Sequence, residues 1–238
     1  MQLPSKLTPE PLVEAVVEVR FESAMPQGDV ISKMLLALNK SFPQFNSIDI
    51  PPELRSTPQF KYHGSMALAR GNLSTRIGHN VISVNCTTPY LGWPRYFQEV
   101  KNSLKEVFRN IAIYKVERLG VRYINFFEGE SNLLENLDLN FEIRKLKELS
   151  INQFFVRSNI MRNGVEQLIS ISDHAQINTK PQAEGILVDI DSSLSSNIPN
   201  YLSDEFYEEI DRLHRAGKEL FISLLSEKFL NKFSPQYT

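Results

Sequence analysis

VERLGVRYINFFE, residues Val116 to Glu128, lies near the middle of the 238-residue chain and has the pattern of a long, half-buried β-strand. From Leu119 onward, Leu119, Val121 and Tyr123 point to one side and the residues between them to the other. This is the two-residue period of a strand with one packed face. An earlier stretch, VEAVVEVRFE at Val13 to Glu22, aligns with it when one residue is skipped. We interpret the two stretches as the opening strands of two similar halves.

The composition is that of an ordinary globular protein, with 42% hydrophobic and 23% charged residues, so the chain can bury a large core. A net charge of −2 excludes a broad electrostatic attraction to phosphate backbones or anionic lipid. Cys86 is the only cysteine, which excludes an internal disulfide. No signal-peptide pattern and no apolar run long enough to span a membrane are present. We therefore expect a cytoplasmic protein.

The first half, residues 1–111, is predicted to follow the order strand, short helix, three strands, long helix. In its first strand, Ala15, Val17, Val19 and Phe21 are expected to face the core. The predicted elements are a strand at 12–22, a short helix capped by Asp29, an irregular stretch at 45–58, strands at 59–69, 73–77 and 81–86, and a long helix that begins at Trp93-Pro94.

The second half, residues 112–238, repeats this order after its opening strand. The predicted elements are a weak helix at 132–139, a hairpin of 149–162 and 165–172 around Asn163-Gly164, a strand at 185–191, and a long helix capped by Ser203. The sequence thus predicts an α+β fold built from a pseudo-duplicated β-α-β-β-β-α unit, with antiparallel sheets and a long helix packed on each. The two halves are intimately packed or form one domain.

Charged residues on the strand faces opposite the core form the candidate ligand-binding site: Glu18, Arg20, Arg122, Asp189 and Asp191. If these faces converge, Asp189 and Asp191 offer the oxygen ligands that Mg²⁺ prefers, and the two arginines can grip phosphate. The other interpretation, which we favour, is a solvated sheet face on which opposite charges pair across strands.

A second candidate surface is aromatic. Tyr90, Trp93 and Arg95 lie just before and within the first long helix, beside Tyr96 and Phe97. Such residues dominate many partner-binding surfaces and base-stacking platforms. We favour the simpler interpretation, in which Trp93 and Phe97 wedge the helix onto the sheet.

No motif in the sequence specifies a catalytic chemistry. The histidines, His63, His79, His174 and His214, lack the paired spacing of zinc motifs. Asp173-His174 is a weak candidate for an acid–base pair, because no nucleophile is placed beside it. The glycine patterns of nucleotide-binding loops and of the serine nucleophile elbow are absent. We therefore propose no catalytic residue.

Four motifs carry a resemblance to a known family. They are PLVEAVVEVRF at 11–21, ERLGVRYIN at 117–125, GILVDID at 185–191, and Leu213-His214 in a helix that ends with Leu220-Phe221. In these the chain resembles an uncharacterised, sporadically distributed bacterial protein family of about this length. The resemblance brings no established activity, cofactor or catalytic residue. The sporadic distribution implies spread with mobile islands, which often hold defence or toxin–antitoxin genes.

The sequence therefore predicts a non-enzymatic binding protein of the bacterial cytoplasm, within a defence or toxin–antitoxin type of system. We expect a protein partner, no membrane and no cofactor; nucleic acid and a second copy of the chain stay open as partners. The alternative is a metal-assisted phosphohydrolase or a nucleotide-binding protein that uses the charged sheet face with Mg²⁺.

Overall fold

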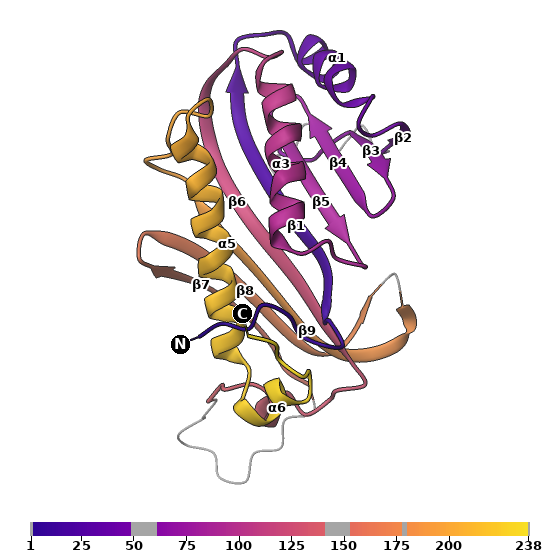
Figure 1. Ribbon diagram of the computed structural model, residues 1–238, viewed down its shortest axis with the longest axis vertical. Coiled ribbons are helices and arrows are strands. Elements are labelled where there is room, and N and C mark those ends of the chain that lie inside the picture. Colours follow the sequence, from indigo (N-terminus) through magenta and orange to yellow (C-terminus); the bar gives the residue numbers. More distant parts are fainter. Residues whose placement is uncertain (1, 49–60, 141–152, 178–179, 238) are drawn as a thin grey trace. The chain divides into compact units, whose positions relative to one another are not determined.

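The computed structural model describes residues 2–48, 61–140, 153–177 and 180–237 (Figure 1). Within these residues, nine strands form one antiparallel sheet in the order β2-β3-β4-β5-β1-β6-β9-β8-β7. The strands are β1 (Leu12–Ser23), β2 (Gln44–Ser47), β3 (Met66–Arg70), β4 (Leu73–Gly78), β5 (Val81–Thr87), β6 (Ile113–Glu128), β7 (Phe155–Arg162), β8 (Val165–Ile177) and β9 (Lys180–Leu194). The helices are α1 (Gln27–Leu38), α3 (Trp93–Phe108), α4 (Leu133–Asn136), α5 (Asp204–Leu224) and α6 (Glu227–Asn231).

The predicted α+β class and antiparallel pairing are confirmed, but the sheet is larger than predicted. Instead of a separate sheet for each half, one sheet contains both opening strands, because β1 and β6 are neighbours. The division into residues 1–111 and 112–238 and the superposition of the two halves stay predictions.

Contacts divide the chain into two compact units. The α3 unit consists of residues 14–121 and 193–213, and the α6 unit consists of residues 1–13, 122–192 and 214–238. The strands β1, β6 and β9 and the helix α5 contribute residues to both units. Each unit has a buried apolar core of its own, described in turn below.

In the α3 unit, helices α1 and α3 cover one face of the strands (Figure 1). The predicted core face of β1 is confirmed, because its members have no exposed surface: Ala15, Val17, Val19 and Phe21. The buried Tyr96 of α3 holds the helix on the sheet, with its hydroxyl 2.7 Å from the carbonyl oxygen of Val84 and 3.2 Å from that of Ala15. Burial raises the pKa of the Tyr96 hydroxyl well above its usual value.

In the α6 unit, the core is built from alternate residues of β8 and β9 and from the last turns of α5 with α6. Its central aromatic side chain is Phe127, whose ring packs against Phe221, Phe229 and Phe233. At Gly185 a Cβ atom would lie 2.3 Å from the carbonyl oxygen of Phe127. The close approach of the backbones of β6 and β9 at this point therefore requires glycine.

Several predicted boundaries change. The strand β2 overlaps the start of the stretch expected to be irregular, 45–58, and pairs with β3. The first helix starts at Gln27 after Pro26, so Asp29 lies in its first turn and is not its cap. Ser203 precedes α5 as predicted, and its hydrogen bond to Glu205 lowers the pKa of that carboxyl.

Among the helices of the described residues, none is both long and apolar enough to cross a bilayer.

Candidate functional site

A network of charged and aromatic side chains covers the face of the α3 unit opposite its helices. We call it the Arg20 face and define it by Glu18, Arg20, Tyr62, Glu117 and Arg118. The Glu18 carboxylate binds both guanidinium groups, at 2.7 Å from Arg20 Nε and 3.1 Å from Arg118 Nη1. The Arg118 side chain is 16% exposed and that of Arg20 31%, so both are held while Arg20 still reaches solvent.

Tyr62 joins β1 to β6 in this network. Its ring lies 4.6 Å from the guanidinium carbon of Arg20, a cation–π distance, and its hydroxyl donates a hydrogen bond to Glu117. Burial opposes the ionisation of Glu117, but hydrogen bonds with Tyr62 and Glu22 and then the charge of Lys61 outweigh it. The pKa of Glu117 therefore lies below its usual value. Glu117 is ionised at neutral pH and fixes the Tyr62 ring over Arg20.

Gly120 provides the space that Arg118 occupies. A Cβ atom at residue 120 would lie 2.4 Å from Nη1 of Arg118, so any larger residue would displace the guanidinium from this position. Consecutive residues Glu117 and Arg118 both reach partners of this face. Both residues precede Leu119, where the predicted alternation of the middle strand begins, and from Leu119 onward burial does not alternate strictly, because Leu119, Gly120 and Val121 are all buried.

Around the Arg20 face, charges are matched by ion pairs. These pairs join four carboxylates with five cationic side chains: Glu14, Glu18, Glu22 and Glu117 with Arg20, Lys61, Arg76, Lys115 and Arg118. Beside them on β5, the buried Asn85 accepts a hydrogen bond from Ser83 and donates one to Glu14. The face is thus a nearly neutral, preorganised polar surface.

The remaining predicted ligand-binding residues belong to the α6 unit. Arg122 of β6 and Asp189 of β9 form a bidentate pair, with distances of 2.8 Å from Nε to Oδ1 and 2.6 Å from Nη2 to Oδ2. Asp191 is half-buried on the same strand. The structure thus pairs Arg20 with Glu18 and Arg122 with Asp189. The alternative, in which all five residues line one cavity, stays a hypothesis.

The predicted partner-binding residues have packing contacts in the α3 unit. Trp93 is stacked on Phe97 at 4.9 Å between ring centroids, and its indole N–H donates to Asp211 of α5 at 2.7 Å. Tyr90 packs edge-on against Tyr96, whereas Arg95 is exposed. These contacts join Trp93 to α3 and α5, and the predicted wedging of α3 onto the sheet by Trp93 and Phe97 stays a prediction. A role of Tyr90, Trp93 and Arg95 in partner binding stays a prediction.

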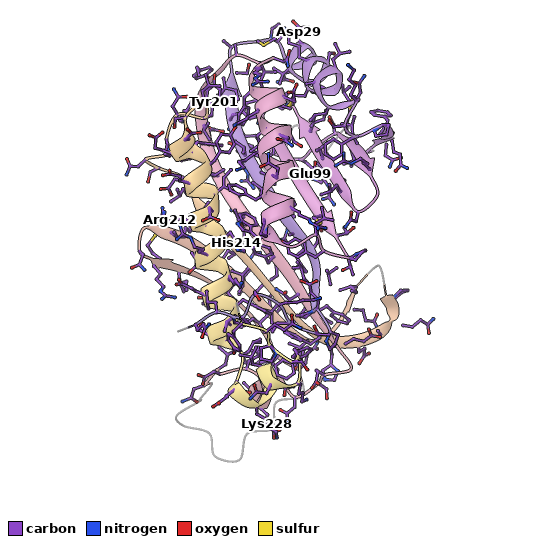
Figure 2. All side chains as sticks on the ribbon, viewed as in Figure 1. Asp29, Glu99, Tyr201, Arg212, His214 and Lys228 are labelled. Carbon is purple, nitrogen blue, oxygen red and sulfur yellow. The ribbon has the colours of Figure 1, made fainter. Side chains whose placement is uncertain are left out.

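The histidines do not gather into one site. His214 of α5, labelled in Figure 2, is 2.6 Å from the hydroxyl of Tyr123 through Nδ1. Asp173 and His174 have different partners, because Asp173 accepts a hydrogen bond from the backbone N–H of Phe154 while His174 lies 3.3 Å from Glu184. The acid–base pair considered for Asp173-His174 is therefore not formed.

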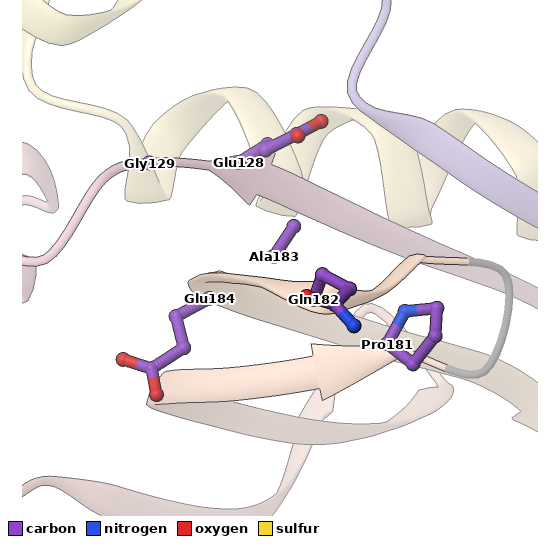
Figure 3. A pocket seen from close by; sticks show the side chains of 6 residues that line it. All are labelled: Glu128, Gly129, Pro181, Gln182, Ala183 and Glu184. Carbon is purple, nitrogen blue, oxygen red and sulfur yellow. The ribbon is translucent and has the colours of Figure 1, made fainter.

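The α6 unit also carries an open groove of about 450 Å³ at the end of β6 and the start of β9. Glu128, Gly129 and residues 181–184 line it. In Figure 3 the side chains of Glu128 and Glu184 extend in opposite directions, so these two carboxylates do not converge on one point. Over the part of the chain that the structure describes, no three His, Cys, Asp or Glu side chains come together as ligands for a metal ion.

Sequence reasoning missed three residues of the Arg20 face. Glu117 and Arg118 stand in the middle strand, but a strict alternation assigns only one of them to the polar face. Tyr62 lies in a stretch predicted as a strand, and nothing in the local pattern indicates that its ring meets Arg20. Contacts between residues so far apart in the chain have no signal in a single sequence.

Two comparisons with known proteins were negative. No protein-family model matches the chain, and no curated protein matches it either. The resemblance to a bacterial family therefore stays a prediction.

Proposed function

We propose that the chain is a non-enzymatic binding protein whose Arg20 face contacts a protein partner. One observation carries this proposal: Arg20 is fixed between the Glu18 carboxylate and the Tyr62 ring while a third of its side chain reaches solvent. Arginine and tyrosine are the residues that most often dominate the binding energy of protein interfaces. Fixing them before binding reduces the conformational entropy lost when a partner docks.

The balance of charge favours a protein over a nucleic acid as the partner. Binding to a phosphate backbone relies on cations that neutralise several phosphates at once. On the Arg20 face each of the five cations named above has a carboxylate within ion-pair distance. A protein surface that carries positive, negative and aromatic side chains complements such a face better than a polyanion does.

The experiment is affinity capture with matched variants in the source organism. Wild type, Arg20→Ala, Tyr62→Ala and the control Arg109→Ala are each expressed with the same tag. Arg109 has a 70% exposed side chain and pairs with Glu106 at the end of α3. We expect one partner protein to be recovered with wild type and with Arg109→Ala. The amount of this protein recovered with Arg20→Ala or Tyr62→Ala should be at least about tenfold lower, which corresponds to a loss of about 1.4 kcal/mol of binding energy. Equal recovery with all four, at unchanged thermal midpoints, would contradict the proposal.

The alternative is a metal-assisted phosphohydrolase or a nucleotide-binding protein that uses Asp189 and Asp191. The bidentate pair with Arg122 weakens this alternative, because it occupies both oxygens of Asp189. Calorimetric titration of wild type with Mg²⁺ and Mn²⁺ separates the two functions. Micromolar binding that disappears in Asp189→Asn would favour the alternative, whereas the binding proposal expects no tight site at these residues.

The proposal retains three further elements. It places the protein in the cytoplasm, as the sequence composition and patterns suggested, and in a bacterial defence or toxin–antitoxin type of system, as the resemblance implies. It also includes an internal duplication, supported by the chain order of β1, α1 and α3 in one half and β6, α4 and α5 in the other. Superposition of residues 12–111 on residues 114–228 tests the duplication, which would be contradicted if β1 and β6 do not occupy equivalent positions.

A further inference from the structure

The edge strand β7 exposes large apolar side chains. Phe155 is 68% exposed and Met161 is 71% exposed, although β7 is a regular strand paired along its length with β8. It is the last strand in the sheet order, and Figure 1 shows it at the sheet edge beside β8. Exposed apolar side chains on a long edge strand are the features that natural proteins normally avoid, unless another strand pairs there.

The hairpin turn determines which backbone groups of β7 point outward. Asn163 and Gly164 both have positive φ, 51° and 73°, as a two-residue type I′ turn requires, and Arg162 faces Val165 across it. The two residues that flank such a turn form backbone hydrogen bonds with each other. Along the two strands, residue pairs that form these hydrogen bonds alternate with pairs that do not. Four residues of β7 therefore direct their N–H and C=O groups away from β8: Phe155, Arg157, Asn159 and Met161.

The sequence of β7, FVRSNIMR, is self-complementary about Ser158. If a second copy of β7 runs antiparallel with the two Ser158 residues opposite each other, Phe155 meets Met161 and Val156 meets Ile160 of the other copy. Arg157 then meets Asn159. In this register the outward-pointing residues are also the ones placed opposite one another, so they can exchange backbone hydrogen bonds.

We infer that β7 is a self-association edge, at which two copies of the chain join their sheets around a two-fold axis through Ser158. The pairing would cover both strongly exposed side chains, Phe155 and Met161, with each other. The pairing is isologous, because both copies use the same strand. The β7 edges of both copies are then occupied, so the association through β7 stops at a dimer. This surface is separate from the Arg20 face, which lies on strands of the α3 unit.

The charges on β7 make the pairing sensitive to salt. Arg157 lies opposite the neutral Asn159, but the two copies of Arg157 are diagonal neighbours across the axis, at about 7–8 Å. Their repulsion is screened as the ionic strength rises. Dimer formation should therefore strengthen with salt, which is opposite to the behaviour of an interface held by ion pairs.

The test uses a pair of variants that complement each other only in this register. Phe155→Glu and Met161→Lys each place a charge against an apolar side chain of the other copy. When the two variants are mixed, one contact joins the new carboxylate with the new ammonium group, and the other restores Phe155 against Met161. Sedimentation velocity should show a concentration-dependent dimer for wild type, monomers for each variant alone, and a dimer for the mixture.

The control is Leu36→Glu on α1, where the side chain is 72% exposed but far from β7 in sequence and outside the sheet. It should dimerise like wild type. Hydrogen exchange gives an independent readout, because amides of β7 should exchange several-fold more slowly as the wild-type concentration rises. A wild type that is monomeric at all concentrations would overturn the inference and leave the edge to a strand of another protein. A dimer that survives both single variants, or a mixture that stays monomeric, would overturn it as well.

Discussion

The strands β1 and β7 show how position in a sheet changes the role of apolar side chains. β1 has neighbours on both sides, its core-facing residues from Ala15 to Phe21 have no exposed surface, and its charged residues are matched by partners. β7 is an edge strand, and its largest apolar side chains, Phe155 and Met161, are 68% and 71% exposed. On an inner strand the apolar residues stabilise the fold, whereas on this edge they remain available for association.

The largest effect is expected when a charge is placed on the buried face of β1. Val17 has no exposed surface and pairs with the equally buried Val84, so Val17→Asp should unfold the protein, at a cost above about 4 kcal/mol. Met161→Asp on β7 should change the stability by less than about 0.5 kcal/mol. Urea unfolding of both variants measures the contrast. Similar losses for the two would show that β7 belongs to the core.

A smaller effect is expected at the charged face. Glu18→Gln removes the carboxylate that binds Arg20 and Arg118, and because these groups are partly buried it should cost about 1–2 kcal/mol. The matched control is Glu106→Gln on α3, which breaks a largely exposed pair with Arg109 and should cost about 0.3 kcal/mol. Thermal unfolding distinguishes the two. Equal and negligible costs would mean that the Arg20 face is not preorganised by Glu18.

A stabilising change is expected at Thr75 on β4. Its side chain is fully buried, and among the described residues its hydroxyl has no hydrogen-bond partner. Thr75→Val keeps the shape and removes the cost of burying that hydroxyl, so the stability should rise by about 1 kcal/mol. Thr87→Val is the control, because the Thr87 hydroxyl is exposed and donates to the carbonyl of Asn72. A loss of stability in Thr75→Val would mean that the hydroxyl has a partner.

The smallest effect concerns pH. Burial and then the charge of Lys61 lower the pKa of His79 below its ordinary value of 6.5. As the pH falls below about 6.5, the His79 ring binds a proton in the unfolded chain before it does so in the folded chain. The free energy of unfolding therefore decreases from its value at neutral pH, and it stops decreasing once the pH is below the pKa of His79 in the folded protein. NMR titration of the His79 ring should give a pKa below 6.5 that rises in Lys61→Gln. A ring pKa above 6.5 in wild type would reverse the sign.

Local patterns predicted much of the fold. The two-residue period assigned the buried face of β1, and Asn163-Gly164 predicted the hairpin of β7 and β8. Prolines predicted the element boundaries only in part. Pro94 correctly indicated the start of α3, whereas the prolines around β2 led to the prediction of an irregular stretch where a short edge strand lies. The single sheet was not predictable, because the pairing of β1 with β6 is set by contacts far apart in the chain.

The site was predicted less completely. Glu18, Arg20, Arg122 and Asp189 were identified as charged strand residues, since alternation assigns them to the polar face. Their pairing could not be predicted, because the partner of each is decided by strand order and by the length of its side chain. The ring of Tyr62 packs on the guanidinium group of Arg20. Tyr62 lies outside the strands, so the alternation of strand residues does not indicate this contact.

Site-specific photocrosslinking from residue 62 tests most directly whether the Arg20 face is a partner-binding surface. Tyr62 is replaced by p-benzoylphenylalanine, which crosslinks only to groups in contact with it, and the protein is irradiated in the source organism. The control carries the same residue in place of Tyr237, which is 48% exposed. We predict one discrete heteromeric product from residue 62 that is absent from the control and is lost when Arg20→Ala is added. No product from residue 62, or the same product from both positions, would contradict the account.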